Sequence, residues 1–370
     1  MREGDEWKTA FICPQGLFES LVMTFGLCNA PATFQTMMDN IFIVYVRRGD
    51  ASTFIDDIGI ATGSDPTGKL SDKEFHIKTV CEILQVFRDN HLYLKPEKCI
   101  FLQKEIGYLG HVISRIGVKP DPVKVNGVSE WPVPTNLKTL RSFLGFLNYY
   151  RRFIPGFSAV AQPLNDLTKK DTPFEWNDER QYAFEKLKKL ITKYPTLAYP
   201  DQEKPFLVET GASNFTYGAV ISQQDEKDIW RPIGFVSHSM TPPERNYDTH
   251  DQELLAIVKV LEEWRHYLQG TKHQVLILTD HANLTHFRQA QNLNRHQARW
   301  MRFLEAFDFK FVYRPGRLNS VPDYLSRRNN YKTDDIKEDN KGQILLPDHL
   351  FPMEQINALK EKQKELFDLR

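Results

Sequence analysis

The sequence contains no long apolar run. Nowhere do its 370 residues include the roughly 18 consecutive apolar residues that a membrane-spanning helix requires. Its first residues, Met1-Arg2-Glu3-Gly4-Asp5, are largely charged and lack the apolar core of a secretion signal. Both absences argue against a membrane protein or a secreted protein. We therefore expect an intracellular protein, in the cytoplasm or the nucleus, with no membrane partner.

Cysteine is also scarce. The four cysteines, Cys13, Cys28, Cys81 and Cys99, are widely separated in the sequence. No close pair suggests a zinc knuckle, and a disulfide scaffold is not expected at this density. We expect free thiols in a reducing compartment.

A net charge of either sign is absent as well, because 48 Lys and Arg residues balance 48 Asp and Glu residues. Over the whole chain, this balance argues against a nucleic-acid-binding protein. Residues 95–152, however, contain ten Lys or Arg against four Asp or Glu, interleaved with aromatic residues. Such a stretch suits a surface that follows a phosphate backbone. A solvated basic helix face gives the same pattern, so composition leaves both interpretations open.

The remaining composition is that of globular domains, with 41% hydrophobic and 12% aromatic residues. The length predicts about two to three domains, and no internal repeat is evident. Apolar periodicity and helix start signals predict helices at residues 32–46, 72–90, 137–150 and 178–193. Strand and turn signals predict a hairpin at 53–61 with two acids at its tip, a loop at 65–68 and a strand pair at 106–113.

From about residue 204 the pattern changes to strands alternating with helices. We expect strands at 206–209, 217–222, 233–237, 275–278 and 309–313, a helix at 250–268, and two helical stretches between the last two strands. This order predicts an α/β domain of about 125 residues. From residue 329 the chain is charged and weakly apolar, which predicts a partly disordered tail with a helix at 353–366.

Two adjacent acids, Asp56 and Asp57, lie between apolar residues of the predicted hairpin. Neighbouring carboxylates repel each other unless a cation compensates them. A hairpin tip with such oxygen ligands suits Mg²⁺ and leaves positions open for phosphate oxygens, as two-metal phosphoryl transfer requires. A plain turn explains the pair too, because Asp favours turns.

The surrounding motifs resemble the reverse transcriptases of gypsy-class LTR retrotransposons. In chain order they are residues 4–11 (GDEWKTAF), 23–35 (MTFGLCNAPATFQ), 54–58 (FIDDI), 108–113 (YLGHVI), 140–145 (LRSFLG) and 148–154 (NYYRRFI). By this resemblance residues 4–11 form a strand, residues 108–113 are the primer grip, and residues 140–154 belong to the thumb. With the motifs of a second domain, the similarity runs over about 325 residues.

The resemblance also implies roles for single residues. Phe25 and Gly26 would lie under the sugar and base of the incoming dNTP, and Gln35 would lie near the template. Gly110 and His111, with the basic and aromatic residues that follow them, would hold primer and template.

Asp56 would be a ligand of Mg²⁺ or Mn²⁺, and Asp57 its less essential partner. The family's first metal-binding aspartate lies about ten residues before the GDEWK box, and the sequence starts after that point. We therefore expect that the chain alone binds the catalytic metals poorly and does not polymerise.

A second set of candidate acids comprises Glu253, Asp280 and Asp323. Singly, each has a structural explanation, since an acid favours a helix N-terminus and Asp caps helices. Their motifs, at residues 251–258 (DQELLAIV), 278–284 (LTDHANL) and 313–327 (YRPGRLNSVPDYLSR), resemble the RNase H domain of the same family. The resemblance implies that these acids hold two Mg²⁺ or Mn²⁺ ions, which activate a water to cleave the RNA strand of a hybrid.

One RNase H motif departs from the family pattern. The family has Glu-Thr-Asp-Ala-Ser, whereas this chain has Glu209-Thr210-Gly211-Ala212-Ser213. Gly211 offers no ligand at the position that would bridge both metals. Glu209 would lie on the same strand face but nearly 7 Å away along the strand. We therefore expect little or no RNase H cleavage.

The predicted fold is a multidomain chain of α/β and α+β parts. We expect a partial reverse transcriptase palm at 1–115, thumb and connection at 116–203, an RNase H-like α/β domain at 204–328 and a charged tail at 329–370. The expected partners are an RNA or DNA template-primer, an RNA–DNA hybrid, dNTPs and other segments of a Pol polyprotein. A non-catalytic, domesticated nucleic-acid-binding protein is the alternative, and an unrelated metal-dependent nuclease would require the ordered motifs to be coincidence.

Overall fold

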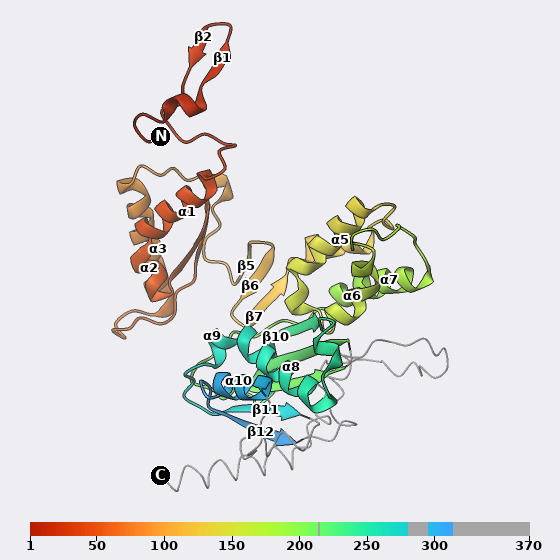
Figure 1. Cartoon of the computed structure of the whole chain (residues 1–370). Helices are drawn as coiled ribbons and strands as arrows, with labels where there is room; N and C mark the ends of the chain where they lie inside the picture. The colour runs from red at the N-terminus through yellow and green to blue at the C-terminus, as the bar shows by residue number, and fades with distance from the viewer. Residues whose placement is uncertain (214, 280–294, 314–370) are drawn as a thin grey trace. The chain divides into compact units, whose positions relative to one another are not determined.

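The computed structural model describes residues 1–213, 215–279 and 295–313 (Figure 1). These residues belong to two compact units, Met1–Gln103 and Lys104–Arg370. The predicted division into four parts is finer than this and stays a prediction. Asp280, Asp323, the first helical stretch after residue 279 and the predicted tail lie outside the described residues.

The first unit packs three helices against a short hairpin. Its elements are η1 (Glu6–Thr9), β1 (Phe11–Cys13), β2 (Gly16–Phe18), α1 (Ala30–Ile41), α2 (Ile43–Arg48), β3 (Ala51–Phe54), β4 (Asp57–Ile60), α3 (Asp72–Asp89) and η2 (Pro96–Lys98). Met38, Phe42, Ile83 and Phe87 form the buried core. A capping box starts α3, because Ser71 and Glu74 exchange side-chain and backbone hydrogen bonds.

Two predictions for this unit are wrong in detail. The single helix expected at 32–46 is broken at Phe42, whose side chain is buried with its ring centroid 4.9 Å from that of Phe87. The strand expected at 4–11 is instead a 3₁₀ turn, Glu6–Thr9, and pairing begins only at Phe11. At Phe42 a contact made after folding overrides the local helical pattern, whereas the 3₁₀ turn departs from what the resemblance implied.

The second unit begins with a three-stranded antiparallel sheet followed by helices. The elements are β5 (Glu105–Tyr108), β6 (His111–Ser114), β7 (Gly117–Pro120), α4 (Pro122–Ser129), α5 (Leu137–Tyr149), η3 (Arg151–Phe153), α6 (Phe157–Asp166) and α7 (Asp178–Thr192). Asn136 caps α5 and Asn177 caps α7 through their side-chain oxygens. The predicted hairpin and both predicted helices are therefore present, whereas β7, α4 and α6 were not expected.

A five-stranded mixed sheet completes the second unit. Its strands are β8 (Leu207–Ala212), β9 (Thr216–Gln224), β10 (Trp230–Ser239), β11 (Val275–Thr279) and β12 (Phe309–Tyr313), in the order β10-β9-β8-β11-β12. The described connections hold η4 (Glu244–Asn246), α8 (Thr249–Glu263), α9 (Arg265–Leu268) and α10 (Arg295–Leu304). The helix expected at 250–268 is interrupted at Trp264, which is buried in the core of the sheet.

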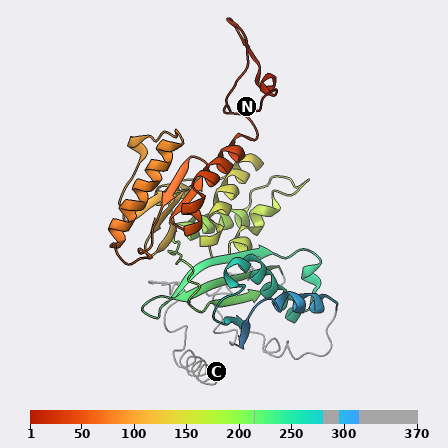
Figure 2. The ribbon, with the colours of Figure 1, turned by 90° about the vertical axis from the view of Figure 1, so that its left-hand side faces the viewer.

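Helices cover the sheet on both faces (Figures 1 and 2). Ala219, Ile221 and Val236 pack with the apolar side of α8, whereas Val220 and Phe235 point the other way and join the core of α5, α6 and α7. Strand alternation places these neighbours on opposite faces. Strands β9 and β10 therefore hold the helices and the sheet together as one body.

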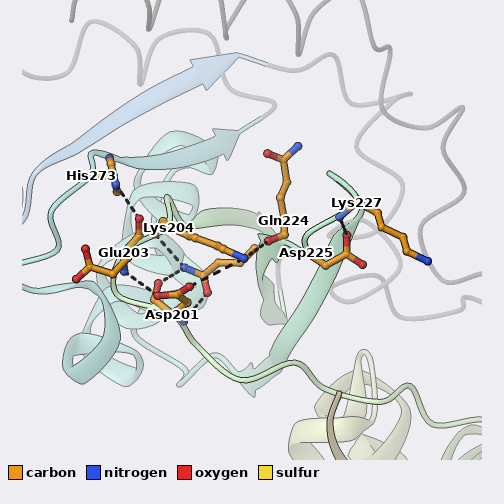
Figure 3. A network of polar contacts seen from close by, with 8 residues as sticks. Asp201, Glu203, Lys204, Gln224, Asp225, Lys227 and His273 are labelled. Carbon is orange, nitrogen blue, oxygen red and sulfur yellow. Dashed lines mark hydrogen bonds and ion pairs between the residues drawn. The ribbon is translucent and has the colours of Figure 1, made fainter. Parts of the chain in front are cut away.

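Hydrogen bonds hold the loop that precedes β8 (Figure 3). The buried Gln223 side chain accepts from the backbone N–H of Asp201 and donates to the carbonyl oxygens of Asp201 and Lys204. A ring nitrogen of His273 lies 2.9 Å from the carbonyl oxygen of Glu203. The loop that leads into β8 is therefore tied to β9 and to the segment before β11.

No helix among the described residues is both long and apolar enough to cross a membrane. All four cysteines are free thiols, as their spacing predicted.

The segment 196–198 passes unusually close to the start of β7. Val118 and Leu197 exchange both backbone hydrogen bonds, at 2.8 and 2.9 Å. Gly117 has φ +145°, and a Cβ atom there would lie 2.1 Å from the carbonyl oxygen of Leu197. Only glycine fits this position.

Gly117→Ala should therefore lower the free energy of unfolding by about 2–3 kcal/mol, because the methyl group forces two backbone segments apart. Gly107→Ala is the matched control in the same sheet, since an added Cβ there meets no atom within 4 Å. Chemical denaturation of both variants measures the difference. Equal stability of the two would contradict the close approach.

Candidate catalytic sites

The hairpin expected at 53–61 is present and carries both aspartates. Phe54 pairs with Asp57, so Ile55 and Asp56 form a two-residue turn between β3 and β4. Both aspartates are exposed. Ile55 has φ +52°, a left-handed conformation that is a true outlier for a β-branched residue. Such outliers persist only where surrounding contacts enforce them.

Gln35 of α1 supplies contacts of this kind. Its side-chain Oε1 accepts from the backbone N–H of Ile55 at 2.6 Å. Its Nε2 donates to Asp39 at 2.6 Å and lies 3.3 Å from the carbonyl oxygen of Thr53. The Thr53 hydroxyl donates to the same Asp39 oxygen at 2.7 Å. The Gln35 amide therefore binds the hairpin at Ile55 and also binds Asp39, which accepts from Thr53 of the hairpin. The sequence did not indicate this role.

Phe25 and Gly26, the expected nucleotide platform, lie in the segment between β2 and α1. The Phe25 side chain is fully exposed. Gly26 has φ +95°, and an added Cβ there would meet no atom within 4 Å. The structure places both residues in open space, and their contact with a nucleotide stays a prediction.

The carboxylates of Asp56 and Asp57 have the hard oxygen donors that Mg²⁺ prefers. Within the part of the chain that the structure describes, no group of three His, Cys, Asp or Glu side chains could hold a metal ion. The hairpin offers two exposed carboxylates, and their role as metal ligands stays a prediction.

Gly110 and His111 lie at the turn between β5 and β6. Gly110 has φ +73°, and His111 begins β6 with Nδ1 2.9 Å from the carbonyl oxygen of Leu109. Burial lowers the pKa of His111, and the cations Arg152 and Lys124 lower it further, against the hydrogen bond to Leu109. A neutral ring in which Nδ1 carries the proton fits this contact.

The second candidate site lies where β8 meets α8. Gly211 of β8 is opposite Gly218 of β9. Glu253 of α8 is buried, and its Oε1 accepts from the backbone N–H of Ala212 at 3.1 Å. Glu209, two residues before Gly211, is also buried. The structure therefore brings Glu253 to the backbone of Ala212, next to position 211, and its role as a metal ligand stays a prediction. Asp280 and Asp323 cannot be placed, because they lie outside the described residues.

One buried acid near this site was missed by the sequence reasoning. Asp251 accepts from Gln297 at 2.7 Å and lies 2.9 Å from Nε2 of His296, so it joins α8 to α10. Burial raises the pKa of Asp251, but the hydrogen bonds from His296 and Gln297 outweigh this and leave the pKa below its ordinary value. No local signal could reveal the link, because its partners are 45 and 46 residues away.

The bonds of Gln35 lead to a direct test. Gln35→Ala should lower the free energy of unfolding by about 1–2 kcal/mol and speed the amide exchange of Ile55, because the turn loses its acceptor. Gln85→Ala is the matched control: Gln85 makes the same contact to an acid four residues later, Asp89, at 2.7 Å. Exchange of Ile55 that is equally slow in both variants would rule out the support by Gln35.

Comparison with known proteins gives two domain matches. Residues 1–113 match the family of reverse transcriptases (RNA-dependent DNA polymerases). Residues 201–307 match the RNase H-like domain found in reverse transcriptases.

Full-length relatives match over most of the chain. The Transposon Tf2-3 and Tf2-7 polyproteins of Schizosaccharomyces pombe are each 39% identical over 329 residues, or 88% of this chain. The chain spans only 24% of the length of these relatives.

Solved structures support the same fold. The foamy viral protease-reverse transcriptase in complex with dsDNA has a TM-score of 0.70 and 21% identity, and the match covers 85% of this chain and 64% of that one. The complex of that protein with an RNA/DNA hybrid has a TM-score of 0.68 and 21% identity, covering 91% and 44%. The ordered domains and the close relatives together establish that the chain belongs to the Pol polyproteins of gypsy-class LTR retrotransposons, with a reverse transcriptase domain followed by an RNase H-like domain.

Proposed function

We propose that this chain is the part of a retrotransposon reverse transcriptase that holds the nucleic acid, and that its RNase H-like domain does not cleave RNA. The observation that carries the proposal is Gly211, on the strand where Glu253 reaches the backbone of Ala212. A two-metal site needs a carboxylate that bridges both ions, and glycine has no side chain to supply one.

Glu209 is the nearest acid that could take over, but its position argues against this role. It lies two residues from Gly211 on the same strand, nearly 7 Å along β8. Its side chain is buried, and a carboxylate fixed at that depth cannot move to the missing position without disturbing the core. Mg²⁺ or Mn²⁺ would then find an incomplete set of ligands.

For the polymerase domain, we infer that Asp56 is a metal ligand and Asp57 a weaker partner. The exposed hairpin tip supports this inference, because the carboxylates are open to solvent and to phosphate oxygens. With two acids in the described site, metal affinity of this chain should be weak. Polymerisation with dNTPs needs the remaining ligands of a two-metal centre.

The proposed substrates are a template-primer duplex and an RNA–DNA hybrid. The solved relatives of similar fold were captured with dsDNA and with an RNA/DNA hybrid. In this chain the helix α5 and the segment after it expose basic and aromatic side chains, among them Lys138, Arg141 and Tyr149. Such a surface binds phosphate backbones.

The alternative function is a non-catalytic nucleic-acid-binding protein, and Gly211 favours it as well. The two proposals differ in one respect: a reverse transcriptase segment should regain cleavage when the lost acid is restored, whereas a repurposed binder need not keep the other ligands in place.

Restoring the acid tests cleavage. The unmodified chain should not cleave the RNA strand of a hybrid with Mg²⁺, and Gly211→Asp should raise cleavage at least about tenfold above background, because the bridging carboxylate returns. Gly211→Asn has the same size without the charge and should stay inactive. Mg²⁺-dependent cleavage by the unmodified chain would contradict the proposal, and an inactive Gly211→Asp variant that still folds would favour the alternative.

Salt dependence tests nucleic-acid binding. The affinity for an RNA–DNA hybrid should fall at least about tenfold between roughly 50 and 200 mM salt, because bound phosphates release counterions. Arg141→Gln should reduce the slope of log affinity against log salt by about one. Lys272→Gln is the control, because Lys272 is paired with Glu203 at 2.6 Å on the sheet domain. Fluorescence anisotropy measures the affinity of the unmodified chain and of both variants. An affinity that does not change with salt concentration would refute the proposed phosphate-binding surface.

A further inference from the structure

We propose that Tyr149 and Tyr150 are positioning residues, which hold the turn of Leu109 and Gly110 in the conformation that binds nucleic acid. This inference rests on the proposed function, because it takes the turn to be part of the nucleic-acid-binding surface. It assigns a role to two side chains that the motif comparison identified only as members of an aromatic stretch.

The turn itself is an unfavourable conformation. Tyr108 pairs with His111, so Leu109 and Gly110 alone connect β5 to β6. Both have positive φ, +48° for Leu109 and +73° for Gly110. A two-residue hairpin of this type requires left-handed backbone at both positions. Glycine adopts this conformation freely, but leucine does not, so contacts from elsewhere must stabilise Leu109.

The two tyrosines supply these contacts from the end of α5. The Tyr149 hydroxyl donates to the carbonyl oxygen of Leu109, and the Tyr150 hydroxyl donates to that of Gly110 at 2.8 Å. Consecutive side chains thus bind consecutive carbonyl groups, 40 residues apart in the sequence. The backbone N–H of Asp121 also donates to Gly110 at 3.1 Å.

Burial favours the hydrogen bond of Tyr150 in particular, because it keeps the hydroxyl protonated and away from water. Its side chain is almost completely buried, and burial raises its pKa to about 12, with smaller effects of Tyr149 and Asp121. The hydroxyl therefore keeps its proton and remains a donor at neutral pH. A buried hydroxyl also has no water to replace a lost partner.

Ring contacts complete the arrangement. The rings of Tyr149 and Tyr150 meet edge to face at 4.9 Å, and the His111 ring lies 5.2 and 5.5 Å from them. A Cβ atom at Gly110 would lie 3.1 Å from the Tyr150 hydroxyl and 3.1 Å from Nζ of Lys124. The turn, the start of β6 and the end of α5 are therefore packed as one body.

The charges around this body suit a phosphate group. Lys124 and Arg152 both act on His111 as positive neighbours. Neither forms an ion pair with an acid among the described residues. A turn that is already fixed loses less conformational entropy when it binds a partner. The tyrosines would therefore strengthen binding without touching the phosphate.

The test removes the two hydroxyl groups and nothing else. In the double variant Tyr149→Phe with Tyr150→Phe, affinity for an RNA–DNA hybrid should fall about tenfold, since each hydrogen bond contributes a few-fold to such an equilibrium. The salt slope should not change, because no charge is lost. Tyr199→Phe is the control: its hydroxyl donates to Ser114 at 3.0 Å, at the opposite hairpin of the same sheet, and its loss should leave affinity unchanged.

Amide hydrogen exchange of the chain without nucleic acid is the second measurement. The double variant should exchange faster at Gly110 and His111, and the Tyr199→Phe control should not. The single variant Tyr149→Phe, at a half-exposed position, serves if the double variant does not fold. Unchanged exchange at the turn overturns the proposal, even if affinity falls, because the tyrosines would then act by direct contact. If the unmodified chain does not bind the hybrid, the proposed function fails, and exchange alone decides whether the tyrosines hold the turn.

Discussion

The second unit depends on one constraint: strands β9 and β10 are buried on both faces. Ala219 and Val236 face α8, while Val220 and Phe235 face the helices that precede the sheet. Each strand is therefore part of two cores. The end of β10 is bound by α6 as well, since Ser158 donates its hydroxyl hydrogen to the carbonyl oxygen of Ser237 at 2.5 Å and Gln162 accepts from Ser239 at 2.6 Å. The end of β10 is thus attached to α6, and a covered edge is less available for pairing with another chain.

Local signals predicted the elements whose causes are local. The helices predicted at 137–150 and 178–193 agree with α5 and α7 within one residue. The structure adds that Asn136 and Asn177 cap their starts. Breaks with a distant cause were missed. Phe42 interrupts a helix because its ring is buried against α3, and Trp264 interrupts another because it enters the core of the sheet. Both helices look continuous in sequence, since no glycine or proline marks either break.

The sites follow the same division. The acids of the first site are adjacent in sequence, so their place at a hairpin tip could be predicted from residues 53–61 alone. The contacts that stabilise this hairpin could not be predicted from the same residues. Gln35, which binds Ile55, is 20 residues away from it in the sequence. At the other turn, Tyr150 binds Gly110, which is 40 residues away. A motif match shows that such residues belong to a family pattern but does not say which backbone atom each one binds. The template contact expected of Gln35 stays a prediction, and its amide already binds the hairpin.

The attachment of α8 to β8 in the RNase H-like domain does not depend on which residue occupies position 211. A buried carboxylate needs hydrogen-bond donors when no metal is bound, and Glu253 finds one in the backbone N–H of Ala212. That donor belongs to the main chain, so it is present whichever residue occupies position 211. The contact joins α8 to β8 and requires no acid on the strand. The loss of a strand acid that we propose for position 211 would therefore leave this helix–strand contact in place. The proposed loss of cleavage is therefore compatible with a folded domain, on which the proposed binding of a hybrid depends.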